Sequence, residues 1–422
     1  GTVSSTAALE SNGSTLIVAT ASSTTAGIKS TTSTITVRST GGDVTANGTN
    51  TTLAVGSAMT FQATRNVINS SASTFTTNKG ALIFSADSDG DGVGYNRTTG
   101  GSTFNTANGG TLGTESGGGD MVFAGGSTFD ANNYPTGYAV SDGTYAGFAS
   151  GEGGSSTLTT SYYTGGGKFI VKGKSTGTMD AVAFNYGTKV WTSTGQIDVD
   201  GLNTSSGLGV QLERNTGTTT NFVSSSTTSP AIKFNAVSGT GYGFISGKSQ
   251  GTANSVYIQA TGAGGGITIN GDGGGDPLWD ISFTSTNLLS KGTITLNTAG
   301  TGWNGGIGTN SIDNGSGSLS VIGYCDATTC PASQVTSSSA NININTDRFG
   351  SYSADVLLKV NTAGQFSMVP NSTTGFIQIK TAGTGLSFSE DCTGVTIGTD
   401  QSTNAYTDYN YEFYPNIKIA GP

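Results

Sequence analysis

The stretch GGGITING, from Gly264 to Gly271, places a short alternating strand between two glycine clusters. Ile267 and Ile269 alternate with Thr268 and Asn270, which is the period-2 pattern of a strand with one buried face. Units of the same kind recur at intervals of roughly 20–30 residues, as they do in repeat proteins. They lie at residues 34–38, 168–172, 293–297, 341–345 and 376–380.

This repeat predicts an all-β fold, a rod-shaped parallel β-helix (β-solenoid) in which each coil contributes two or three short strands. Like residues would stack on like residues, with Ile, Val, Leu and Phe facing inward and Thr, Ser and Asn facing outward. A β-sandwich is the alternative, but it does not repeat one glycine-flanked unit so uniformly over the whole chain. At about 20–28 residues per coil, we expect roughly 15–20 coils.

The composition supports this fold. Glycine contributes 68 of 422 residues, which suits many tight corners, and charged residues make up only 10%. Charges repeated in every coil would lie about 4.8 Å apart and repel one another. Disorder is the competing interpretation of a Gly-, Ser- and Thr-rich chain, but the periodic placement of the apolar residues argues against it.

Charge and hydropathy exclude several classes of partner. The net charge is −9, and the 17 basic residues are scattered, so we do not expect binding to nucleic acid. The sequence contains no apolar stretch long enough to span a membrane as a helix. It begins at Gly1 without a signal peptide, which we interpret as a processed mature segment.

Histidine is absent from the sequence. This excludes Ser-His-Asp nucleophilic systems and the usual zinc, copper and iron sites, so we do not expect an enzyme. Cysteine occurs three times, and the spacing of Cys325 and Cys330 predicts a small local disulfide in an oxidising compartment. Cys392 is then left as a small apolar residue or an intermolecular bridge.

The C-terminal stretch differs from the repeats. We expect residues 1–405 to form the solenoid body and residues 406–422 to form an aromatic cap or a subunit contact, because an open solenoid end otherwise pairs with another edge. The aromatic residues that would make this contact are Tyr406, Tyr409, Tyr411, Phe413 and Tyr414.

The segments Gly41–Ala46, Ala81–Gly92 and Gly195–Gly201 place Asp- and Gly-rich corners around short strands. In this repeat style the chain resembles the filamentous-haemagglutinin-type exoproteins of bacteria. The resemblance implies a right-handed parallel β-helix that is secreted by a two-partner system and acts as an adhesin or surface fibre. The secretion domain of that family, with its Asn-Pro-Asn-Gly-like motif, is not found here, which leaves the secretion route open.

The corner SADSDGDG, from Ser85 to Gly92, places Asp87, Asp89 and Asp91 at alternate positions. The pattern matches the first half of an EF-hand loop, but Thr98 stands where the twelfth-position Glu is required. We interpret the stretch as a solvated corner, because Asp and Gly favour turns. A looser calcium site remains the alternative, because three neighbouring carboxylates repel one another unless a cation joins them. No other cofactor is expected.

Two further groups of residues suggest contact with carbohydrate. Asp198 and Asp200 flank Val199 on a predicted strand, so both carboxylates face outward, as in glycosidases and lyases that use paired acids. The sequence shows no Lys or Arg immediately beside them. Exposed aromatic residues could form a platform for sugars, although core positions are the more usual place for such residues. These are Tyr162, Tyr163, Trp191, Trp279 and Trp303.

Together these features predict a secreted structural or adhesive protein of the cell surface. It would be either a segment of a filamentous adhesin or an extracellular filament subunit that polymerises head to tail. The expected partners are neighbouring solenoid segments or further copies of the chain, together with host or matrix glycans. A carbohydrate-active enzyme, a polysaccharide lyase or glycosidase, is the alternative function.

Overall fold

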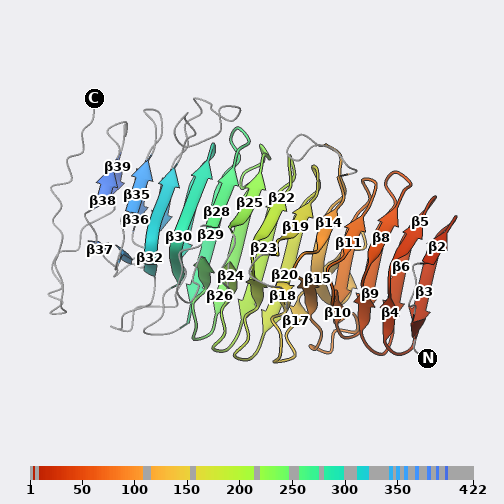
Figure 1. Ribbon diagram of the computed structural model, residues 1–422. Coiled ribbons are helices and arrows are strands. Elements are labelled where there is room, and N and C mark those ends of the chain that lie inside the picture. The colour runs from red at the N-terminus through yellow and green to blue at the C-terminus, as the bar shows by residue number, and fades with distance from the viewer. Residues whose placement is uncertain are drawn as a thin grey trace.

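The computed structural model of the protein describes residues 3–4, 9–107, 116–152, 158–212, 219–246, 256–274 and 280–298. Beyond residue 298 it describes strands only, at residues 311–322, 342–345, 348–351, 356–359, 366–369, 378–381, 386–388 and 395–397. The chain winds into a parallel β-helix whose coils stack from the N-terminal end, red in Figure 1, towards the blue C-terminal strands. The described residues form strands, turns and bends, without a helix.

Each coil contributes one strand to each of three parallel sheets. The first sheet begins with β1 (Val3–Ser4), β4 (Ser23–Thr25), β7 (Val44–Ala46), β10 (Val67–Ile68), β13 (Asn96–Thr99) and β18 (Phe148–Glu152). It continues through β21 (Val182–Phe184), β24 (Val210–Leu212), β27 (Phe244–Ser246), β30 (Ile281–Ser290), β32 (Ser311–Ile322), β34 (Arg348–Ser351) and β37 (Gln378–Thr381).

The second sheet follows the first along each coil. It begins with β2 (Leu9–Ser11), β5 (Ile28–Ser30), β8 (Thr49–Thr52), β11 (Thr74–Thr76), β14 (Thr103–Asn105) and β19 (Thr160–Tyr163). It continues through β22 (Thr188–Trp191), β25 (Thr220–Ser224), β28 (Val256–Ala260), β35 (Val356–Lys359) and β38 (Leu386–Phe388). The long strands β30 and β32 run through both sheets and join them.

The third sheet is the most regular. It begins with β3 (Thr15–Ala19), β6 (Ile35–Ser39), β9 (Met59–Ala63), β12 (Leu82–Ala86), β15 (Met121–Phe129), β20 (Phe169–Ser175) and β23 (Ile197–Asn203). It continues through β26 (Ile232–Ser238), β29 (Ile267–Gly273), β31 (Ile294–Thr298), β33 (Ile342–Asn345), β36 (Phe366–Val369) and β39 (Val395–Ile397).

The third sheet therefore passes through thirteen described coils, fewer than the 15–20 expected from the sequence. Some coils are much longer than expected, because segments are inserted between their strands. Leu82 aligns with Met121, and Met121 in turn aligns with Phe169. Insertions lengthen a coil without adding a layer to the stack, so chain length divided by repeat length overestimates the number of coils.

Inward side chains form apolar ladders along the stack. In the third sheet one such ladder is fully buried over nine coils: Ile35, Met59, Leu82, Met121, Phe169, Ile197, Ile232, Ile267 and Ile294. Aromatic rings fill the wider coils, where Phe104 stacks on Phe75 and Tyr162, with ring centroids 4.8 Å apart in both pairs. Parallel stacking gives each buried ring a partner one coil away.

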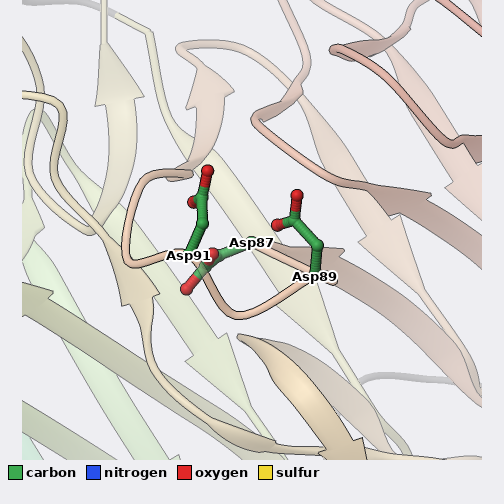
Figure 2. A group of neighbouring side chains, drawn as sticks. All are labelled: Asp87, Asp89 and Asp91. Carbon is green, nitrogen blue, oxygen red and sulfur yellow. The ribbon is translucent and has the colours of Figure 1, made fainter.

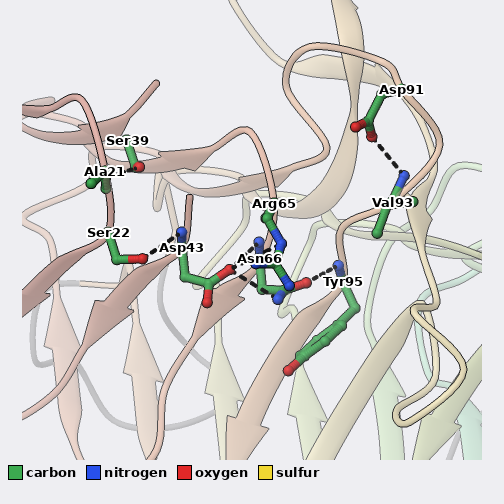
Figure 3. A network of polar contacts seen from close by, with 9 residues as sticks. All are labelled: Ala21, Ser22, Ser39, Asp43, Arg65, Asn66, Asp91, Val93 and Tyr95. Atoms are coloured by element: carbon green, nitrogen blue, oxygen red, sulfur yellow. Dashed lines mark hydrogen bonds and ion pairs between the residues drawn. The ribbon is translucent and has the colours of Figure 1, made fainter. Parts of the chain in front are cut away.

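Corners are held by side chains that bond to the next coil. Ser22 accepts a hydrogen bond from the backbone N–H of Asp43, Asp43 accepts one from Asn66, and Asn66 accepts one from Tyr95 (Figure 3). The three donors occupy equivalent positions on successive coils. Asp43 directly precedes β7, Asn66 precedes β10 and Tyr95 precedes β13. Each corner thus satisfies a backbone donor that the sheets leave unpaired.

One insertion folds back over the outside of the third sheet. After Gly125 the strand β15 continues beyond the stack and forms a hairpin with β16 (Pro135–Gly137), and β17 (Ala139–Val140) then pairs with β20. On the outward side of the neighbouring strands, Ile83 and Val122 are at most 4% exposed. The outer face of these coils is therefore covered, whereas most outward positions elsewhere on the sheet are partly exposed.

The described residues include no helix that is long and apolar enough to cross a membrane. The predicted cap or subunit contact lies outside the described residues, as do its members Tyr406, Tyr409, Tyr411, Phe413 and Tyr414. The same is true of Cys325, Cys330 and Cys392, so the disulfide stays a prediction.

Candidate functional site

The Asp87 corner begins where β12 ends and the chain must turn away from the sheet. Asp87 adopts a left-handed backbone conformation, with a φ of 50°, which Asp and Asn tolerate better than most residues. Its N–H donates to the carbonyl oxygen of Arg65 at 3.0 Å. Its own carbonyl oxygen accepts from the N–H of Gly90 at 3.0 Å and of Gly126 at 3.1 Å, which ties the corner to the inserted hairpin.

Three carboxylates meet at this corner. One carboxylate oxygen from each of Asp87, Asp89 and Asp91 lies within 4.8 Å of the others (Figure 2). Asp89 and Asp91 are exposed, but Asp87 is only 3% exposed. Its carboxylate accepts a hydrogen bond from the N–H of Gly92 at 3.1 Å, and that of Asp91 accepts one from Val93 at 2.9 Å (Figure 3).

Burial is the main reason why the pKa of Asp87 rises to about 6. The nearby carboxylates of Asp91 and Asp89 raise this pKa further, and the hydrogen bond from Gly92 opposes them. The sequence predicted that the three carboxylates lie close together. It did not predict the burial of Asp87, because the covering hairpin follows some forty residues later in the chain.

The donor set fits a hard divalent cation. Calcium prefers carboxylate and carbonyl oxygens and takes six to eight of them, so three carboxylates would be a partial shell, completed by carbonyl groups or water. A cation here would also favour the ionised form of Asp87, against the effect of burial. Calcium at Asp87, Asp89 and Asp91 therefore stays a prediction with a matching donor set.

A second polar cluster lies on the outer face of the third sheet. Asp198 aligns with Lys233 on the next coil, and Asp200 aligns with Lys172 on the preceding coil. The hydroxyl of Tyr138, from the inserted segment, donates to Asp200 at 2.9 Å, and Lys172 donates to the carbonyl oxygen of Thr136 at 3.0 Å. Burial raises the pKa of Asp200, while Tyr138 and the two lysines oppose that rise.

Sequence reasoning missed Tyr138, Lys172 and Lys233 as neighbours of the two carboxylates. The two lysines lie roughly 30 residues from the aspartates that they face, which is one coil of this solenoid. The alternating strands at residues 168–172 and 195–201 contained the signal. Aligning their apolar positions, Phe169 with Ile197, would have placed Lys172 beside Asp200.

The predicted aromatic group divides between the core and the surface. Tyr162 is fully buried, and its hydroxyl bonds to Thr98 and Ser150 at 2.8 Å, so it takes no part in a sugar platform. Tyr163 and Trp191 lie side by side on the outward face of the second sheet, with ring centroids 6.4 Å apart. Trp279 and Trp303 lie outside the described residues.

No family model, curated protein or solved structure matches the chain. The filamentous-haemagglutinin resemblance therefore rests on the repeat style of the sequence. The stacked parallel strands agree with it in architecture, and a common architecture does not define a function. What the residues establish is a repetitive parallel β-helix with two clusters of charged side chains, one at the Asp87 corner and one on the outer face of the third sheet.

Proposed function

We propose that the chain is a secreted structural or adhesive protein, a rigid rod that works at the cell surface or in an extracellular filament. The observation that carries this proposal is the apolar ladder of the third sheet, which is fully buried without interruption from Ile35 to Ile294. An architecture in which every coil packs only on its neighbours is suited to spanning distance. Thirteen coils at about 4.8 Å each correspond to a rod of roughly 60 Å.

The outward side chains support the same proposal. Some aligned outward positions place opposite charges side by side, as with Lys172 and Asp200. Others place side-chain amides where they hydrogen-bond to one another. Asn270 donates to Asn235 at 2.6 Å, and Asn297 donates to Asn270 at 2.7 Å. Such ladders tie each coil to the next on the outside of the stack and leave a long polar surface for contacts with glycans or neighbouring rods.

Two forms of this function remain. The chain is either one segment of a long adhesin of the filamentous-haemagglutinin type, exported by a partner protein, or a subunit of a filament. Electron microscopy of the purified chain at low and high concentration separates them. Single short rods at every concentration support the segment, long filaments support the subunit, and compact globular particles would contradict both.

Adhesion is tested separately, by retention of the labelled chain on an array of host and matrix glycans. The partly exposed aromatic pair, Tyr163 and Trp191, is the first surface to probe. Trp191→Ala should reduce any saturable binding, whereas Tyr257→Ala, on a neighbouring outward row, serves as the matched control. A rod that is retained on no glycan would remove the adhesive part of the proposal and leave the structural part.

A carbohydrate-active enzyme is the second candidate, and the polar cluster on the third sheet favours it. Paired carboxylates with lysines on both sides are groups that acid–base chemistry on sugar polymers uses. The test is turnover of uronic-acid polymers with and without calcium. Turnover that is lost in Asp198→Asn and Asp200→Asn, but not in Asp142→Asn, would establish the enzyme over the structural rod.

A further inference from the structure

The outer face of the second sheet changes character in the middle of the stack. On β14 the two outward residues are Thr103 and Asn105, which are short and polar. The residues that align with Asn105 on the next two coils are Tyr163 and Trp191. Both β19 and β22 have described strands on either side, so they lie in the interior of the stack (Figure 1). The aromatic pair is therefore a local departure from the polar pattern of this face.

The two rings present carbon atoms to their surroundings. Both side chains are partly exposed, and they meet edge to face, with an angle of 79° between the ring planes. The indole N–H of Trp191 is buried and has no hydrogen-bond partner among the described residues. The exposed part of this side chain is therefore ring carbon, which stacks on a flat partner and does not donate a hydrogen bond to it. The apolar face of a sugar ring is such a partner.

A lysine stands beside the aromatic pair without a counter-charge. Lys189 precedes Trp191 by two residues on β22, so both side chains point to the same face, roughly 7 Å apart along the strand. Lys189 is partly exposed, and its ammonium group makes no ion pair or hydrogen bond with a described residue. Glu152, at the end of β18, instead accepts a hydrogen bond from Asn185 at 2.8 Å. The positive charge of Lys189 is therefore available to a partner.

The charge of this face differs from that of the whole chain. The strands β14, β19, β22, β25 and β28 contain no Asp or Glu, although acidic residues outnumber basic ones by 26 to 17 in the sequence. On the third sheet, by contrast, lysines align with aspartates. At physiological salt, interactions between exposed charges are screened over about 8 Å, so an anion that approaches β22 responds to Lys189 more than to the net charge of −9. The face is thus complementary to a negatively charged partner.

We propose that Tyr163, Trp191 and Lys189 form a binding site for an acidic glycan, a sugar chain that bears carboxylate or sulfate groups. The two rings contact the apolar faces of the sugars, and Lys189 pairs with the acidic group. Asn221, which aligns with Lys189 on the next coil and is partly exposed, supplies a side-chain amide for the sugar hydroxyls. The proposal rests on the adhesive part of the proposed function and specifies the class of glycan that the rod binds.

The test compares acidic sugars with neutral counterparts at about 0.15 M salt. Immobilised oligogalacturonate and its methyl ester share a sugar ring and differ in the charge of the carboxyl group, and dextran sulfate beside dextran makes the same comparison for sulfate. We expect the full chain to bind at least one acidic member about tenfold more tightly than its neutral counterpart, as one hydrogen-bonded charge pair provides. Lys189→Gln should remove most of that preference. Lys174→Gln is the matched control and should keep it, because Lys174 is also partly exposed but lies on the third sheet.

Two substitutions of Trp191 test the role of the rings, with circular dichroism to confirm folding. Trp191→Ala should abolish binding to the acidic sugars, whereas Trp191→Phe keeps a flat ring and should retain part of it.

Several results would overturn the acidic site. Equal binding to acidic and neutral sugars, or a preference that survives Lys189→Gln or is lost in Lys174→Gln, would do so and leave the proposed adhesive rod standing. Retention on none of these sugars would overturn the site, and retention on no glycan at all would remove the adhesive function with it. Self-association of the rods that Trp191→Ala abolishes, without any binding to sugar, would assign the rings to a contact between rods instead.

Discussion

Asp87 illustrates how a residue changes character when distant chain segments fold over it. Its neighbours in sequence, Asp89 and Asp91, are exposed, as a corner rich in Asp and Gly predicts. Asp87 itself is buried, because the inserted segment bonds to the corner on two sides. The N–H of Gly126 donates to its carbonyl oxygen, and Gly94 exchanges hydrogen bonds with Val140.

The raised pKa of Asp87 makes the stability of the protein depend on pH. Because the folded-state pKa of about 6 exceeds the ordinary value of 3.8 for Asp, the folded state binds a proton more tightly than the unfolded state. Stability contributed by the protonated group is present below pH 4 and is lost as pH rises through 6. The Asp87→Asn variant has no carboxyl group to ionise, so it does not lose this stability as pH rises. At pH 7 the free energy of unfolding of the variant should therefore exceed that of the wild type by at most about 3 kcal/mol.

Denaturant unfolding of both proteins at pH 4 and pH 7 checks this prediction. Asn also tolerates the left-handed backbone conformation and can accept the hydrogen bond from Gly92, so the substitution changes little besides the charge. Asp130→Asn, on the inserted hairpin and outside the group of three carboxylates, is the control for the loss of one carboxylate. Equal stability differences at both pH values for Asp87→Asn would contradict the assignment.

Bound calcium should lower the pKa of Asp87, which burial raises. If a cation binds the three carboxylates, it displaces the proton from Asp87, so added calcium should raise the melting temperature at pH 7 more than at pH 5. Asp87→Asn should lose most of that gain, and Asp130→Asn, on the hairpin, should keep it. A melting temperature that is unchanged by calcium at both pH values would leave the corner as a turn without a metal.

At the scale of single elements, the corner between the second and third sheets repeats a motif of Thr followed three residues later by Gly. The hydroxyl of Thr192 donates to the carbonyl oxygen of Gly195 at 2.7 Å, and Thr164 donates in the same way to Gly167. These corner glycines stack on one another from coil to coil. A Cβ on Gly195 would overlap the carbonyl group of Gly167 on the preceding coil.

Gly195→Ala should therefore be strongly destabilising, because backbone atoms of the neighbouring coil cannot move aside without breaking the ladder. We expect a loss of roughly 2–4 kcal/mol in the free energy of unfolding, as in other cases of severe overpacking. Gly177→Ala is the control, because nothing lies within 4 Å of an added Cβ there and its backbone conformation suits other residues. Chemical unfolding of the two variants gives the comparison, and similar losses in both would contradict the role of stacking.

The elements that were predictable from sequence belong almost entirely to one sheet. The predicted units at 34–38, 168–172, 293–297 and 341–345 coincide with β6, β20, β31 and β33 of the third sheet. Three of these strands, β6, β20 and β31, alternate strictly between buried and partly exposed positions over their first residues. The aligned pairs Phe169–Ile197 and Ile267–Ile294 have the spacing of one coil, as the repeat predicted.

The strands of the other two sheets could not be recognised from the sequence, because they are short and lack clear alternation of apolar and polar residues. In β21 and β27 all three residues are buried, so the outward position has no polar signal. The unit at 376–380 overlaps β37, which belongs to the first sheet and not, like the other predicted units, to the third. Of the candidate sites, the sequence placed the three carboxylates together, but contacts between coils, such as Tyr138 with Asp200, depend on coil alignment.

At the scale of the whole molecule, the coil stack is close to a one-dimensional structure, so its stability should vary along the axis. A strand in the middle, such as β20 or β23, pairs on both sides and encloses the aromatic core, whereas β3 pairs with one described neighbour and leaves Ile17 partly exposed. In such arrays the terminal repeat opens most easily, because opening it breaks one interface and not two.

We therefore predict a gradient of amide hydrogen exchange in dilute solution, fast at Thr15–Ala19 and slowest at Phe169–Ser175 and Ile197–Asn203. Mass spectrometry of peptides from these three strands measures it directly. Core mutations should follow the same gradient: Phe123→Ala, in the aromatic core, should cost about 3–5 kcal/mol, and Leu9→Ala, in the half-open first coil, less than about 1 kcal/mol. Equal protection in all three strands would instead mean that the described coils unfold as one cooperative unit, which is not how nearest-neighbour stacking behaves.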